Sequence, residues 1–157
     1  MSENYNCVTF VRGELSCWES TAQKSKSLKM VSSRRLCYKN SVIFKFDYDQ
    51  ISRVCFNLIK NSVESLKEKG EKTSDFIKNI DIEITEHIDY ISLKIIDSGI
   101  GFKNIKTSDL TKPYFTTKTD GTGLGLSIVS KIINDHNGMI TFTNLKNGAK
   151  VEIKFYK

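Results

Sequence analysis

A one-sided run of apolar residues between positions 51 and 66 constrains the fold most. Apolar side chains recur there at spacings of three and four residues, which predicts an amphipathic helix with one face on a core. These residues are Ile51, Val54, Cys55, Leu58, Ile59, Val63 and Leu66. The aspartates in Asp47-Tyr48-Asp49 suit the start of this helix, and Gly70 is its expected stop. Such a helix needs a second layer to cover its apolar face.

Strand patterns on both sides of this helix predict that second layer. The stretch SVIFKF (41–46) is strand-like, and residues 79–97 alternate in two runs around a polar break at 86–89, which predicts an antiparallel pair. Two further strands are expected in GMITFTN and AKVEIKFYK, joined through Asn147-Gly148. We expect an α+β fold, a two-layer α/β sandwich with a mixed, mostly antiparallel sheet and helices on one face. The second helix is expected after Gly121, with one side formed by Leu126, Val129, Ile132, Ile133 and His136.

The composition is that of a soluble globular chain with one main domain. The chain has 157 residues, of which 39% are hydrophobic and 27% charged. No apolar run approaches the roughly 20 residues needed to cross a bilayer, and the first residues lack the pattern of a secretion signal. We therefore expect a cytoplasmic protein. The four cysteines, Cys7, Cys17, Cys37 and Cys55, lack zinc-ligand spacing and are expected to be free thiols.

Residues 1–40 differ from the rest of the chain. They lack sustained periodicity, so we expect an irregular, poorly ordered segment followed by a folded domain at 41–157. The net charge is +6, and residues 21–43 hold six basic residues and no acidic one. Such a run can contact nucleic acid, but it is more often a solvated arm. We therefore do not expect a nucleic-acid partner.

The polar face of the first helix carries candidate site residues. Asn57, Lys60, Asn61 and Glu64 cluster opposite the apolar stripe. Asparagine is a poor residue for a helix interior, so two of them four residues apart need an explanation. The Asn61 amide oxygen could coordinate Mg²⁺, with Asn57 and Lys60 near the same phosphates. An ordinary solvated helix face is the alternative.

The hexapeptide DSGIGF (97–102) directly follows a strand run. A carboxylate at a strand end, Asp97, can accept hydrogen bonds from an exocyclic amine and so distinguish adenine from guanine. Gly99 and Gly101 supply backbone freedom and let a flat ring approach without a Cβ in the way. A plain turn after a strand is the alternative, and this segment alone does not decide between the two.

The segment GTGLGLSIV (121–129) is a stronger signal. Gly121, Gly123 and Gly125 lead into a helix whose free N–H groups can face an anion. The Thr122 hydroxyl and the Lys118 ammonium could add contacts to a polyphosphate. A dinucleotide fingerprint needs a strand directly before the glycines, and here the polar loop TKPYFTTKTD precedes them. The Walker pattern also fails, because no Lys-Ser/Thr follows the glycines.

Taken in order, these segments resemble the ATP-binding domain of sensor histidine kinases, in particular those of the nitrogen-regulatory type. This domain belongs to the superfamily shared with gyrase, the heat-shock 90 chaperones and the mismatch-repair ATPases, known as HATPase_c or GHKL, with the Bergerat fold. The resemblance covers about residues 41–157, with an N box in NLIKNSVES, glycine boxes in DSGIGF and GTGLGLSIV, an F box in KPYFTTK, and a closing strand in NGAKVEIKF. It implies ATP and Mg²⁺ as cofactors, with Asn61 as metal ligand and Asp97 as adenine reader. It also implies a phosphate cradle formed by Gly121, Thr122, Gly123, Leu124 and Gly125.

Position 57 bears on the reaction that the resemblance implies. In the hydrolytic relatives, a glutamate that activates water stands four residues before the magnesium asparagine. This chain has Asn57 there, and an amide cannot accept a proton at neutral pH. We therefore expect phosphoryl transfer to a histidine, with Asn57, Lys60, Asn61 and Lys118 as the catalytic residues. Glu64 shares the face and is a less favoured candidate base.

The acceptor histidine is expected to come from a separate element. The chain has two histidines, and neither His87 nor His136 lies in the helical HE/HD…NPL context of a phosphoacceptor in this family. His136 is expected to be structural, and residues 1–40 are too few for the dimerisation hairpin. The expected partners are therefore a phosphoacceptor histidine domain in trans and a response regulator. The alternatives are a nonenzymatic nucleotide-binding remnant and a serine kinase like the anti-sigma factor kinases.

Overall fold

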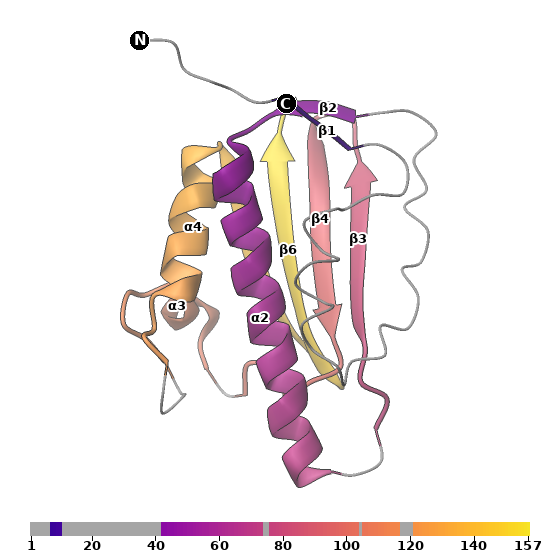
Figure 1. Ribbon diagram of the computed structural model, residues 1–157, viewed down its shortest axis with the longest axis vertical. Coiled ribbons are helices and arrows are strands. Elements are labelled where there is room, and N and C mark those ends of the chain that lie inside the picture. The colour runs from indigo at the N-terminus through magenta and orange to yellow at the C-terminus, as the bar shows by residue number, and fades with distance from the viewer. Residues whose placement is uncertain (1–6, 11–41, 74–75, 104, 117–120) are drawn as a thin grey trace.

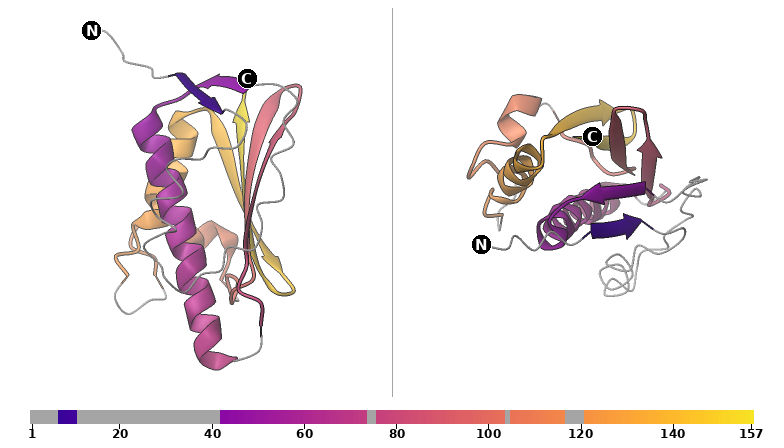
Figure 2. Two further views of the ribbon diagram at one scale, coloured as in Figure 1. Left: turned by 45° about the vertical axis from the view of Figure 1, so that its right-hand side comes forward. Right: turned by 90° about the horizontal axis from the view of Figure 1, so that it is seen from above.

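The structure, a computed structural model, has two layers in its main unit (Figure 1). It describes residues 7–10, 42–73, 76–103, 105–116 and 121–157. Two longer helices, α2 (Tyr48–Lys72) and α4 (Gly125–Asp135), lie on the same face of a four-stranded sheet, as Figure 2 also shows. The strand order is β3-β4-β6-β5, with β3 (Ile80–Glu86), β4 (Tyr90–Asp97), β5 (Gly138–Leu145) and β6 (Gly148–Tyr156). The predicted α+β sandwich is confirmed.

The sheet is a run of antiparallel pairs. β4 pairs with β3 on one side and with β6 on the other, and β5 pairs with β6. The predicted β3–β4 and β5–β6 hairpins are confirmed, and the described part of this sheet contains no parallel pair of the kind a mixed sheet would have. Asp97, the last residue of β4, pairs with Ile80 and Ala149 at the end of the sheet that carries the loops described below.

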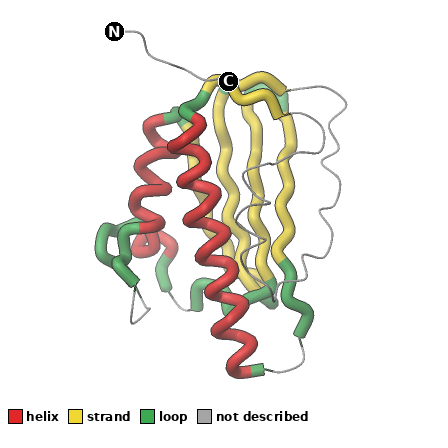
Figure 3. Tube along the Cα trace, viewed as in Figure 1, coloured by secondary structure: helices red, strands yellow, loops and turns green. Residues whose placement is uncertain are grey.

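The core lies between the two helices and the inward face of the sheet (Figure 3). Side chains alternate along β4 and β6, so that every second residue points toward the helices. Val54, Val129, Ile133 and Ile153 are completely buried there. The predicted stripe on the first helix is confirmed at Ile51, Val54, Cys55, Leu58 and Leu66, whereas Ile59 and Val63 are half-buried.

Helix α2 begins as expected and ends later than expected. The Asp47 side chain caps it by accepting a hydrogen bond from the Gln50 N–H at 3.1 Å. The predicted stop at Gly70 is wrong, because the helix continues through this glycine to Lys72. Side chains of the last turn hold it in place: Lys69 Nζ donates to the Ser98 carbonyl at 2.7 Å.

The segments outside the sheet differ in part from expectation. Within residues 1–40, where no regular element was expected, Cys7–Phe10 forms strand β1, which pairs antiparallel with β2 (Val42–Lys45) in a separate two-stranded ribbon. The boundary at residue 41 stays a prediction. In the described parts of the long connection, residues 98–103 and 105–116, the chain is irregular, as expected, except for the short helix α3 (Thr107–Leu110), whose Leu110 is buried.

His136 links the two long helices, which agrees with the structural role expected for it. It caps the end of α4, where its Nδ1 lies 2.8 Å from the Ile132 carbonyl oxygen. Its Nε2 accepts a hydrogen bond from the Asp47 N–H, at the start of α2, at 3.2 Å. This pattern needs the neutral ring with its proton on Nδ1, since Nε2 must accept.

The substitution His136→Ala is expected to lower the free energy of unfolding by about 1–2 kcal/mol, because the Asp47 N–H loses its acceptor. Urea denaturation followed by circular dichroism measures the effect. The variant His136→Gln keeps a donor and an acceptor in its side chain and is expected to lose less. An alanine variant as stable as the wild type would show that this link does not contribute.

Candidate functional site

The end of β4 and the start of α4 both lie beside α2 (Figure 1), and these three segments carry most of the expected site residues. Asp97 ends β4, and its side chain is 6% exposed. The Gly99 N–H donates to its Oδ1 at 2.9 Å, and the Ser62 hydroxyl donates to its Oδ2 at 3.2 Å. Both oxygens therefore act as acceptors inside the protein, and the carboxylate is fixed in one orientation.

Burial raises the pKa of the Asp97 carboxyl above its usual range, and hydrogen bonds from Gly99, Ser62, Ser65 and the Ala149 backbone oppose the shift. A carboxyl whose folded-state pKa lies above its unfolded value favours the folded state at acidic pH. That contribution is lost as the pH rises through the folded-state pKa. The ionised Asp97 carboxylate therefore lowers the stability of the fold at neutral pH. Such an unfavourable buried charge is typical of a functional group.

The first glycine segment passes α2 at contact distance. A Cβ at Gly99 would collide with the Ser65 side chain and lie 2.9 Å from Asp97 Oδ1, so only glycine fits there. The next N–H, that of Ile100, donates to Ser65 Oγ at 3.0 Å. The segment after Asp97 is therefore held directly on the helix.

The far end of this segment is held by the β5–β6 hairpin. Gly101 has a positive φ of 70°, and a Cβ there would lie 2.8 Å from Asn144 Oδ1. Asn144 Oδ1 accepts from the Phe102 N–H at 2.7 Å, and its Nδ2 donates to the Lys103 carbonyl at 3.0 Å. One amide side chain thus makes a pair of backbone-like bonds that fix the exit of the loop.

The second glycine segment leads into α4. Helix α4 starts at Gly125, and among the described residues no side chain caps its N-cap, Leu124. The first N–H groups of such a helix have no intrahelical partner and carry the positive end of the helix dipole. A Cβ at Gly125 would lie 3.1 Å from Asn57 Oδ1, which places the Asn57 amide beside the helix start.

The residues before α4 are in tight contact with the KPYF loop. Gly123 has a positive φ of 67°, and a Cβ there would collide with the Tyr114 backbone. Tyr114 itself has a φ of 63° in a turn that the Phe115 N–H closes on the Lys112 carbonyl at 3.3 Å. Thr122 Oγ1 lies 3.5 Å from the Leu124 N–H, which is a weak contact. The two segments therefore form one folded unit before the helix.

One stripe of α2 connects the two glycine segments. Asn57, Asn61 and Ser65 follow one another at four-residue spacing, which places them on one side of the helix over about 12 Å. Asn57 lies at the α4 end of this stripe, and Ser65 lies at the Asp97 end. Asn61 lies between them and is half-buried. The predicted N box and both predicted glycine boxes therefore meet on one helix.

Two predicted catalytic lysines are not brought to this stripe by any described contact. Lys60 is on the exposed side of α2, with its Nζ 3.9 Å from Glu64 Oε1. Lys118 lies outside the described residues. Asn57 Nδ2 donates to the Arg53 carbonyl at 2.8 Å, so that its Oδ1 is turned toward Gly125.

Three residues of the site were not predicted from the sequence: Ser62, Ser65 and Asn144. Ser62 is 5% exposed and follows Val54 and Leu58 at four-residue spacing on the buried face. A polar residue on an otherwise apolar stripe was the available signal. Ser65 and Asn144 carry no such signal, because their partners are backbone groups 35 and 42 residues away in the chain.

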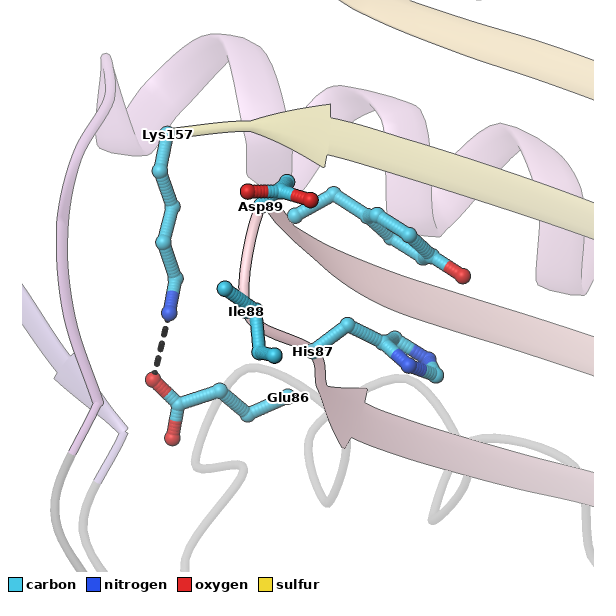
Figure 4. A pocket seen from close by; sticks show the side chains of 6 residues that line it. Glu86, His87, Ile88, Asp89 and Lys157 are labelled. Atoms are coloured by element: carbon cyan, nitrogen blue, oxygen red, sulfur yellow. Dashed lines mark hydrogen bonds and ion pairs between the residues drawn. The ribbon is translucent and has the colours of Figure 1, made fainter.

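A shallow hollow at the β3–β4 hairpin lies at the opposite end of β4, about 23 Å from Asp97. Figure 4 shows its lining side chains, including His87 and the ion pair of Lys157 with Glu86 at 2.8 Å. The His87 ring stacks on Tyr90 with centroids 4.2 Å apart. None of the candidate site residues lines this hollow, so it is not the site assembled on α2.

Within the described residues, no cluster of three or more His, Cys, Asp or Glu side chains could hold a metal ion by itself. The same part of the chain contains no helix with the length and apolar character needed to span a membrane.

Comparison with known proteins identifies similar domains. The family model described as histidine kinase-, DNA gyrase B-, and HSP90-like ATPase matches residues 46–157. An NtrY-like sensor histidine kinase of Rickettsia felis is 34% identical over 140 residues, which cover 80% of this chain and 22% of that protein. Sporulation kinase A of Bacillus subtilis is 34% identical over 120 residues, or 76% of this chain and 18% of that protein. The chain thus spans about a fifth of the length of these curated relatives.

A solved structure also matches. The catalytic domain of the histidine kinase ThkA has a TM-score of 0.61 and 31% sequence identity, with 73% of this chain and 71% of that chain covered. The match covers most of both chains, so the similarity extends over most of that catalytic domain.

Proposed function

Because the chain belongs to the family of histidine kinase-, DNA gyrase B-, and HSP90-like ATPases, we propose that it is the ATP-binding catalytic domain of a two-component sensor histidine kinase. In this proposal it transfers the γ-phosphoryl group of ATP to a histidine of a separate phosphoacceptor domain, from which a response regulator receives it. The domain acts in the cytoplasm, where ATP is available. The similarity to sensor histidine kinases over most of the chain supports this proposal.

The observation that carries the proposal is the buried carboxylate of Asp97. Its two oxygens are fixed by Gly99 and Ser62, and it stands beside a glycine backbone that leaves room for a flat ring. Such a carboxylate accepts from an amine and repels a carbonyl oxygen. Adenine carries an amine where guanine carries a carbonyl, so Asp97 would select adenine.

The start of α4 would hold the phosphates. Its uncapped N–H groups and the neighbouring Gly123 backbone offer donors and a positive helix dipole to an anion. In the proposal, Gly121, Thr122, Gly123, Leu124 and Gly125 form this cradle, and Lys118 adds charge from the adjoining loop. The stripe from Ser65 to Asn57 then runs alongside the nucleotide from base to phosphates.

A magnesium ion fits the donors on α2. Asn61 offers an amide oxygen between the base end and the phosphate end, and Mg²⁺ takes one or two protein oxygens and completes its shell with water and phosphate. The absence of a three-residue ligand cluster among the described residues agrees with this mode of binding. When bound, the ion neutralises charge on the phosphates. Asn61 would hold it, and Asn57 and Lys60 would orient the phosphates.

Transfer is favoured over hydrolysis by the residue at position 57. The Asn57 amide donates to the Arg53 carbonyl and turns its oxygen toward Gly125, so it can position groups but cannot take a proton from water. Phosphoryl transfer depends mainly on positioning and charge neutralisation, which this arrangement supplies.

Calorimetric titration with ADP and GDP in the presence of Mg²⁺ tests the site. ADP is expected to bind at least about tenfold more tightly than GDP, and equal affinities would contradict the assignment of Asp97.

Asn61→Ala is expected to weaken the dependence of ATP affinity on Mg²⁺ while the domain stays folded. Transfer of labelled phosphate from ATP to an added histidine-containing acceptor domain then tests the reaction. Binding without transfer to any such acceptor would favour the nonenzymatic alternative.

Nucleotide binding is expected to depend on pH through Asp97. The ionised carboxylate accepts from the adenine amine more strongly than the protonated form, which also carries an O–H donor, and burial places the pKa of Asp97 above the usual range. ADP affinity should therefore fall as the pH is lowered through this raised pKa, by about tenfold per pH unit below it. Calorimetry between about pH 4 and 8 measures the profile. The variant Asp97→Asn is the control, because protonation of ADP itself affects both proteins.

A further inference from the structure

Ser65 makes more contacts with the Asp97 loop than any role in forming α2 requires. Its Oγ accepts from the Ile100 N–H at 3.0 Å and also hydrogen-bonds Asp97. The same side chain fills the space that a Cβ on Gly99 would need. The Ser65 side chain therefore acts on three positions of the loop, Asp97, Gly99 and Ile100.

We propose that Ser65 is a positioning residue that holds the base-reading loop on α2 and thereby sets the preference for adenine over guanine. The inference rests on the proposed nucleotide-binding function. It extends that function by assigning base selectivity to a side chain that does not itself need to touch the base.

The geometry around the loop explains why this hydroxyl matters. Side chains hold the loop at several points: α2 supplies Ser62 at Asp97, Lys69 at the Ser98 carbonyl and Ser65 at Ile100, and β5 supplies Asn144 at Phe102. Asn144 holds the exit of the loop, and Ser65 holds the part next to Asp97. Without the Ser65 hydroxyl the Ile100 N–H loses its partner, so the backbone at Gly99 and Ile100 is held less tightly against the helix, while the contacts at Ser98 and Phe102 remain.

The ratio of the ADP affinity to the GDP affinity distinguishes a positioning role of Ser65 from a role in the stability of the fold alone. A loosened carboxylate accepts less well from an amine and also repels a carbonyl oxygen less strongly. The loss should therefore fall on ADP, while GDP, which gains little from Asp97, changes little. A general weakening of the fold would lower both affinities in proportion.

The test compares variants of the full chain by calorimetry with ADP and with GDP in the presence of Mg²⁺. Ser65→Ala is expected to weaken ADP binding about tenfold and GDP binding by less than about threefold. Ser65→Thr keeps the hydroxyl and is expected to stay within about threefold of the wild type for both ligands. The matched control is Ser92→Ala, which removes a completely buried serine hydroxyl that contacts His87 at the other end of β4. It is expected to leave both affinities unchanged.

Three results would overturn the inference: unchanged ADP affinity in Ser65→Ala, an equal loss for ADP and GDP, or failure of Ser65→Thr to restore binding. If Ser65→Ala does not fold, Ser65→Cys takes its place in the comparison of ADP and GDP binding. Cysteine keeps the approximate size of the side chain, but its sulfur is a weak acceptor for the Ile100 N–H. Amide exchange gives an independent measure: Ile100 should exchange faster in the variant, and Phe102 should not. Equal binding of ADP and GDP by the wild type would instead contradict the proposed function itself.

Discussion

Replacing Asp97 with asparagine is expected to weaken ADP binding about a hundredfold and to abolish the preference over GDP. Both carboxylate oxygens already accept hydrogen bonds, one from the Gly99 N–H and one from the Ser62 hydroxyl. Asparagine has a single oxygen and an NH₂ group. If the NH₂ turns toward Gly99, it faces the Gly99 N–H, which can only donate. If it turns toward Ser62, the hydroxyl can reverse and accept, but the NH₂ then presents a donor where the base amine needs an acceptor.

The stability of the Asp97→Asn variant shows whether its loss of ADP binding is due to unfolding. The Asp97 carboxyl has a raised pKa because it is buried, so its charge is held at a cost that a neutral amide avoids. The variant is therefore expected to unfold at a temperature close to that of the wild type. Asp89→Asn is the control, since this exposed carboxyl lies in the β3–β4 turn at the far end of β4. ADP affinity retained in Asp97→Asn, or lost equally in Asp89→Asn, would contradict the assigned role.

Periodicity predicted the elements of this fold, because their patterns are local. The stripe of α2 and the alternation in β4 depend on which residues face a core, and burial confirms most of them, whereas β3 is half-buried over most of its length without alternation. The end of α2 depends on contacts distant in sequence. The helix continues past Gly70 to Lys72, and the lysine before this glycine donates to the Ser98 carbonyl, 29 residues away.

The candidate site also contains residues that the sequence predicted and residues that it could not predict. Asp97, Gly99 and the GTGLG segment were predicted from residue type and order, and the structure brings their segments together on α2. The residues that hold the loop in place could not be predicted, since Ser65 and Asn144 act on backbone N–H groups that any sequence offers. Only the packing of α2 and of the β5–β6 hairpin against the loop gives these two side chains a role.

Gly148→Ala is expected to lower the free energy of unfolding by about 3 kcal/mol or more. Gly148 opens β6 with a positive φ of 124°, a conformation that is essentially confined to glycine. A Cβ there would collide with the Asp97 carbonyl oxygen and lie 2.9 Å from the Ser98 Cα. The conflict is with backbone atoms on both counts, so no rotamer change relieves it. Because the displaced strand end carries Asp97, ADP binding should be lost together with stability.

Gly70→Ala provides the matched control, since the same substitution at this position should have the opposite sign. Gly70 lies inside α2, and a Cβ there would approach only the end of the flexible Lys78 side chain, at 3.3 Å. Alanine in a helix interior is favoured over glycine by up to about 1 kcal/mol, so this variant should be equally stable or more stable than the wild type. Urea unfolding of the two variants measures both values in one experiment. A small loss at Gly148 would mean that β6 can shift away from Asp97, and the base-reading carboxylate would then not be rigidly placed by the sheet.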